Sequence, residues 1–131
     1  MSDERRLASQ SEHETKSMLA ARRAEYAALL RDSLHRIVDS LAAVEAVERV
    51  SIFGSYARGR ADLLTDLDVL VVMRTDEGFV DRLRWLYNRL AVPVDLDLVC
   101  YTPEEFAAMR ERPFLRRALQ GEVVLYEKKP T

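Results

Sequence analysis

The sequence has a single cysteine and no long hydrophobic segment. With only Cys100 available, an internal disulfide and a zinc site built from several cysteines are both excluded. No uninterrupted apolar run approaches the roughly 20 residues of a transmembrane helix. The polar first residues lack the apolar core of a signal peptide. These absences predict a cytoplasmic protein that does not associate with membranes.

An excess of positive charge is also missing. The 20 Lys and Arg residues against 22 Asp and Glu residues give a net charge of −2, so no global basic field attracts nucleic acid. We therefore expect no nucleic-acid partner. The apolar fraction of 48% and the charged fraction of 32% are typical of a globular protein. A chain of this length is expected to form one domain.

The polarity of the chain changes along its length. Residues 1–13 have little apolar surface to bury, which predicts a flexible tail. Residues 14–131 are expected to form the single domain. A long helix is predicted for 14–43, because apolar residues recur there at steps of three and four from Tyr26 onwards. Residues 48–126 then contain the core of the domain.

Short apolar runs alternate with helical patterns through this core. The runs predict strands and the patterns predict helices, and the order of the elements indicates an α/β (α+β) fold. We expect a small mixed sheet with helices packed on one face, in addition to the long N-terminal helix. The predicted strands are 48–53, 68–73, 94–100 and 123–126, and the predicted helices that follow the first strand are 77–90, 102–110 and 114–120.

Two strands carry paired carboxylates. Residues i and i+2 of a strand point to the same face, so Asp66 pairs with Asp68 and Asp95 pairs with Asp97. If the two strands are neighbours, three or four carboxylates converge on one place. Such a group is costly to bury unless a cation offsets the charge. Carboxylate oxygens are ligands that Mg²⁺ prefers, so the pattern indicates a site for two Mg²⁺ ions.

A glycine–serine turn precedes the first acidic strand. Gly54 permits close approach of the backbone to a phosphate, and Ser55 adds a hydroxyl group. Arg58 and Arg60 follow closely enough to assist. The turn is not a Walker A loop, because the lysine that this motif requires is missing. Together with the acidic strands, it favours phosphoryl-type chemistry.

The segment Gly54-Ser55-x-Ala57-Arg58-Gly59, followed after six residues by Asp66-x-Asp68, resembles the signature of the minimal nucleotidyltransferases of the DNA polymerase β superfamily. Thr65 replaces the usual serine of that signature and keeps its hydroxyl group. The resemblance spans roughly residues 48–126 and implies a nucleotidyltransferase-like fold.

The resemblance also implies roles for individual residues. Asp66 and Asp68 would bind both metal ions, and Asp97 would complete the site and accept a proton, with Asp95 in reserve as the third acid. ATP would be the nucleotide substrate. The nucleotide-binding residues implied are Gly54, Ser55, Arg58 and Thr65.

The acceptor is suggested by a narrower resemblance. Relatives of this size are similar to the antitoxins of HEPN–MNT toxin–antitoxin pairs, which attach AMP to a tyrosine of the HEPN toxin. The expected partner is therefore a HEPN-type toxin encoded by an adjacent gene. One alternative is a non-catalytic antitoxin that neutralises a partner by contact. Another is a small-molecule, aminoglycoside-type nucleotidyltransferase, although this activity normally needs an additional substrate domain. The sequence leaves open whether the chain forms homo- or hetero-oligomers.

Overall fold

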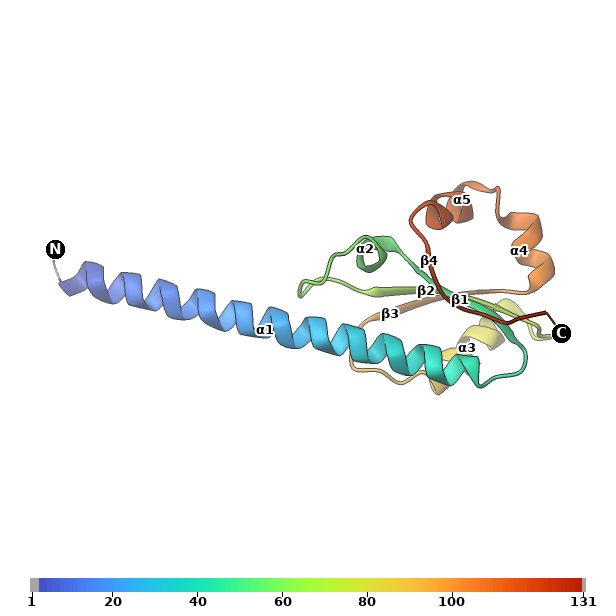
Figure 1. Cartoon of the computed structure of the whole chain (residues 1–131), viewed down its shortest axis with the longest axis horizontal. Helices are drawn as coiled ribbons and strands as arrows, with labels where there is room; N and C mark the ends of the chain where they lie inside the picture. The colour runs from blue at the N-terminus through green and yellow to red at the C-terminus, as the bar shows by residue number, and fades with distance from the viewer. Residues whose placement is uncertain (1–2, 131) are drawn as a thin grey trace.

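The computed structural model describes residues 3–130. It contains a four-stranded sheet, and one very long helix lies beside this sheet (Figure 1). The strand order is β3-β2-β1-β4. Strand β1 is antiparallel to both β2 and β4, whereas β2 and β3 are parallel. The predicted small mixed sheet is therefore confirmed. The strands are β1 (Val47–Phe53), β2 (Leu67–Met73), β3 (Leu96–Tyr101) and β4 (Val123–Glu127).

The helices are divided between the two faces of the sheet. The elements are α1 (Asp3–Ala42), α2 (Gly54–Ala57), α3 (Phe79–Arg89), α4 (Pro103–Met109) and α5 (Pro113–Gln120). Helices α1 and α3 pack against one face, and α4 and α5 against the other (Figure 1). This corrects the expectation that the helices pack on one face. Helical periodicity shows that each helix has a buried side, but not which face of the sheet that side meets.

Strand β2 is the centre of the core. Leu67, Val69 and Val71 face the layer of α1 and α3, whereas Leu70 and Val72 face the layer of α4 and α5. All five side chains are buried. A strand that is buried on both faces needs a continuous apolar run rather than an alternating one, which explains the sequence that follows Asp68.

Helix α1 consists of two different parts. Residues 3–25 are exposed, and packing begins at Tyr26 and continues through Leu30, Leu34 and Ile37. The helix begins at Asp3, so residues 3–13, for which the sequence predicts a flexible tail, are helical in the structure. These residues include no glycine or proline and several good helix formers, so the helix continues without a buried face. Residues 1 and 2 of that tail lie outside the described residues.

Local signals fix the ends of the shorter helices. Thr102 accepts a hydrogen bond from the Glu105 backbone N–H, and the Glu105 carboxylate accepts one from the Thr102 N–H. This reciprocal cap and Pro103 in the first turn start α4, as the sequence predicts.

No helix of residues 3–130 combines the length and the apolar character needed to cross a membrane.

Candidate active site

Three side chains form a row across one face of the sheet. In the strand register, Phe53 of β1 lies opposite Asp68 of β2, and Asp68 lies opposite Asp97 of β3. The row continues the face that Leu70 and Val99 form with α4 and α5. Strands β2 and β3 are neighbours, as the predicted convergence of carboxylates requires. Two of the predicted acids are thereby placed side by side.

Asp66 adds a third negative charge to the row. It is the residue directly before β2, which begins at Leu67. The pKa of Asp68 is raised above its usual value, first by burial and then by the negative charges of Asp97 and Asp66. The positive charge of Arg58 opposes this shift of the pKa. The three acids therefore influence one another electrostatically.

Asp95 has a different position from Asp97. Its backbone carbonyl accepts a hydrogen bond of 3.0 Å from the Leu67 N–H, ahead of the first residue of β3. The register pairs Asp68 with Asp97 and not with Asp95. Of the two candidates for the third acid, Asp97 is the one that faces Asp68.

Gly54 brings the backbone directly against the Asp68 carboxylate. Its φ is +73°, in the left-handed region. A Cβ atom built at this position would lie only 2.2 Å from Asp68 Oδ2. Both the backbone conformation and the space therefore require glycine. The predicted glycine–serine turn is thus in contact with the predicted metal-binding strand.

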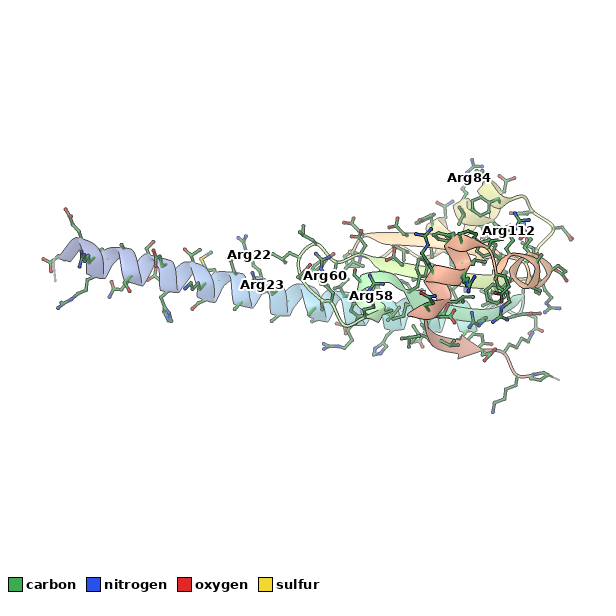
Figure 2. The ribbon with its side chains drawn as sticks, turned by 90° about the horizontal axis from the view of Figure 1, so that it is seen from above. Arg22, Arg23, Arg58, Arg60, Arg84 and Arg112 are labelled. Carbon is green, nitrogen blue, oxygen red and sulfur yellow. The ribbon has the colours of Figure 1, made fainter. Side chains whose placement is uncertain are left out.

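A cavity of about 320 Å³ opens beside this turn, between α2 and α5. No acidic residue lines it. Arg58 follows α2 and reaches the cavity from one side, and Arg117 reaches it from α5. Arg58 is labelled at the α2 end of the domain in Figure 2, next to Arg60. The full lining is Phe53, Gly54, Arg58, Phe114, Arg117 and Ala118.

Arg117 was not among the residues singled out from the sequence. Nothing in the order of residues relates α5 to the glycine–serine turn, because the contact arises from the packing of α5 on the sheet. The cavity gives the site two guanidinium groups on the side away from Asp97. Guanidinium groups suit phosphate oxygens.

Thr65 stabilises the conformation of the loop before β2 through hydrogen bonds with Asp62. Its side chain is fully buried. Its hydroxyl accepts a hydrogen bond from the Asp62 N–H and donates one to the Asp62 carboxylate. Hydrogen bonding to the Arg60 guanidinium, and then to the Leu64 N–H, lowers the pKa of Asp62 to about 2. The predicted nucleotide-binding hydroxyl is therefore enclosed in this loop, whereas Gly54, Ser55 and Arg58 are accessible.

The carboxylates of the row suit a hard divalent cation. In the described part of the chain, no ion pair involves Asp66, Asp68 or Asp97. Oxygen donors of one sign, one of them with a raised pKa, match the preference of Mg²⁺. Residues 3–130 include no group of three His, Cys, Asp or Glu side chains that is already close enough to enclose an ion. The structure thus brings together the Asp68–Asp97 pair, with Asp66 at its edge.

Comparisons with known proteins concern the sequence and the fold of the chain. The model of the nucleotidyltransferase domain family matches residues 32–130. A Sulfolobus solfataricus protein proposed to be a nucleotidyltransferase has a similar structure, with a TM-score of 0.52 and 18% identity over 84% of this chain and 87% of that one. At this identity the similarity concerns the fold. A search of curated proteins found no significant match.

Two further solved structures are similar to a lesser degree. One is a substituted form of the toxin–antitoxin MntA-HpeT, with a TM-score of 0.48 and 17% identity over 76% of this chain and 73% of that one. The other is a toxin–antitoxin with AMP-PNP, with a TM-score of 0.48 and 16% identity over 75% of this chain and 73% of that one.

Proposed function

The chain belongs to the nucleotidyltransferase domain family, and on this premise we propose that it transfers AMP from ATP to a hydroxyl group of a partner protein. The observation that supports this most directly is the row in which Asp68 faces Asp97 beside the backbone of Gly54. This row combines carboxylates for a divalent cation with a turn that leaves room for phosphate. The Asp66 carboxylate at its edge provides the remaining acid.

Each residue of the site has a distinct role in this proposal. Asp66, Asp68 and Asp97 would hold two Mg²⁺ ions, which supply activation of the attacking oxygen and stabilisation of the leaving one. The backbone of Gly54, the Ser55 hydroxyl and the Arg58 guanidinium bind the β- and γ-phosphates. Asp97 is exposed and can meet an incoming acceptor.

The reaction is a displacement at the α-phosphorus of ATP. The acceptor oxygen forms a bond to this phosphorus, and the bond between the phosphorus and the bridging oxygen of the β-phosphate breaks. Pyrophosphate leaves with that oxygen. The proton of the acceptor hydroxyl passes to the Asp97 carboxylate. The products are an AMP-modified acceptor and pyrophosphate.

The proposed acceptor is a tyrosine of a HEPN-type toxin encoded by an adjacent gene, which would make the chain an antitoxin in the cytoplasm. The support is the resemblance of the segment from Gly54 to Asp68 to the minimal nucleotidyltransferases of HEPN–MNT pairs. A net charge of −2 also favours a protein acceptor over nucleic acid. A non-catalytic antitoxin would have no use for unpaired carboxylates beside Gly54.

The test uses ATP labelled on the α-phosphate, the purified chain and the product of the adjacent gene, with and without Mg²⁺. We expect label on the neighbouring protein only when Mg²⁺ is present. The Asp66→Ala/Asp68→Ala variant should transfer none, while its circular dichroism remains that of the unsubstituted protein. A complex that forms without any label, and forms equally with the double variant, would refute catalysis and support the contact antitoxin.

A further inference from the structure

Helix α1 contacts the loop before β2 through one hydroxyl group, that of Tyr26. Tyr26 is the first half-buried residue of α1. Its hydroxyl donates a hydrogen bond of 2.9 Å to the backbone carbonyl of Thr65, the residue directly before Asp66. Burial, and then the negative charges of Asp95, Asp66 and Asp62, raise the pKa of Tyr26. The hydroxyl therefore stays protonated and remains a donor beside the acids.

Helix α3 makes a similar contact with the other acidic strand. The Tyr87 hydroxyl donates a hydrogen bond of 3.2 Å to the Leu96 carbonyl and accepts one of 2.9 Å from the Leu98 N–H. These two residues flank Asp97. Strand β3 is at the edge of the sheet, so its outward backbone groups have no neighbouring strand. Tyr87 occupies the place where such a strand would bond.

We propose that Tyr26 and Tyr87 are positioning residues that hold the backbone next to Asp66 and Asp97, so that both carboxylates meet Asp68. Both tyrosines come from the helices α1 and α3, which cover the face of the sheet opposite to α4 and α5 (Figure 1). Tyr26 precedes the residues that match the nucleotidyltransferase family.

The inference rests on the proposed function but makes a prediction that does not depend on it. Tyr26→Phe and Tyr87→Phe remove only a hydroxyl group and keep the aromatic ring. The first leaves the Thr65 carbonyl without its donor, and the second leaves the Leu98 N–H without its acceptor. Either change loosens the backbone beside one acid. Each variant should show a local loss of order rather than a loss of fold.

Amide hydrogen exchange followed by NMR in metal-free protein measures this order directly. In Tyr87→Phe, the Leu98 amide should exchange about five-fold faster or more, because the hydrogen bond that protects this amide is lost. In Tyr26→Phe, the amides of Thr65 and Leu67 should exchange faster while that of Leu98 does not change. Tyr126→Phe is the matched control, because the Tyr126 hydroxyl makes no hydrogen bond within residues 3–130. Unchanged exchange at these amides would overturn the proposal.

Kinetics then separate positioning from a purely structural role. We expect kcat to fall about ten-fold in each of the two variants, because displacement of a catalytic group by a fraction of an ångström is costly. The KM for ATP should change less than about two-fold, since the phosphate-binding turn is not altered. Faster exchange with an unchanged kcat would also overturn the proposal. If the unsubstituted protein transfers no AMP to any acceptor, it is the proposed function that fails, and the exchange data still decide the backbone contacts.

Discussion

Two groups of charged residues lie on the same face of the sheet. In one group the charges are paired with charges of opposite sign, and in the other they are all negative. Arg49 of β1 binds Glu122 through two hydrogen bonds of 2.6 Å, and Ser51 donates a third of 2.6 Å to the same carboxylate. Asp68 and Asp97 also lie side by side, but both are negative. The register separates the two groups by only a few residues along β1 and β2, since Arg49 pairs with Val72 and Phe53 with Asp68.

The difference shows which charges serve the fold and which are available to a ligand. The exposed fractions of the Arg49 and Glu122 side chains are 16% and 9%, and a charge buried to this degree must be paired within the protein. The charges of Asp66, Asp68 and Asp97 are not offset in this way, and burial, followed by the negative charges of Asp97 and Asp66, raises the pKa of Asp68. A site with perturbed, unpaired carboxylates is typical of function rather than of stability.

The largest predicted effect on stability comes from breaking the ion pair between Arg49 and Glu122. Glu122→Ala leaves the buried Arg49 guanidinium and the Ser51 hydroxyl without their partner. The free energy of unfolding should fall by about 3 kcal/mol, measured by urea denaturation. Asp68→Asn serves as the contrasting variant, because removal of a repelled charge should not lower stability at pH 7. Equal losses in the two variants would show that the two groups do not differ.

A smaller loss of stability is expected when a methyl group is placed between Gly54 and the Asp68 carboxylate. In Gly54→Ala, the left-handed backbone and the close approach to Asp68 Oδ2 both oppose the new Cβ. The loss of stability should be about 2 kcal/mol, and kcat should fall about 100-fold because Asp68 is displaced. Gly78→Ala is the matched control, because a Cβ at Gly78 meets no atom within 4 Å. If Gly54→Ala keeps full activity, the close contact between Gly54 and the Asp68 carboxylate is not needed for catalysis.

The smallest effect is the pH dependence of stability contributed by Asp68 in metal-free protein. Its pKa in the folded state lies above the ordinary value of 3.8, so between these two values the folded state binds more protons than the unfolded state. The free energy of unfolding therefore falls as the pH rises through this window, and the loss persists at pH 7. Because the side chain is only half-buried, solvent screens the effect.

Asp68→Asn removes this contribution and provides the measurement. Urea denaturation of both proteins between pH 3 and pH 7 should show the variant more stable than the parent at pH 7, with a difference that shrinks toward low pH. A difference independent of pH would mean that the charge of Asp68 does not cause it.

Much of the fold follows from local patterns in the sequence. The strand bounds agree with prediction within about two residues, because β2 contains a continuous apolar run and the other strands are mostly apolar segments ended by turns. The cap of α4 is equally readable from Thr102 and Pro103. The extent of α1 is not readable, since residues 3–25 are helical without any buried face to create a pattern.

The candidate site was predictable to the extent that it lies on short motifs. Asp68 and Asp97 lie together because strands β2 and β3 pair in parallel, and Gly54 lies beside Asp68 because it follows Phe53 of the antiparallel strand β1. The contacts of Tyr26, Arg117 and Glu122 join residues that are far apart in the chain. No periodic pattern in the sequence predicts such contacts. The burial of Thr65 depends on Asp62, which a signature-based comparison does not consider.

Helix α1 also determines how the molecule moves through solvent. Its 40 residues correspond to a length of about 60 Å, and the exposed part extends away from the sheet as a rod (Figure 1). A 15.1 kDa chain of this shape should have greater friction than a sphere of the same mass. We expect its rotational diffusion to be anisotropic and its elution from a gel-filtration column to be that of a heavier particle.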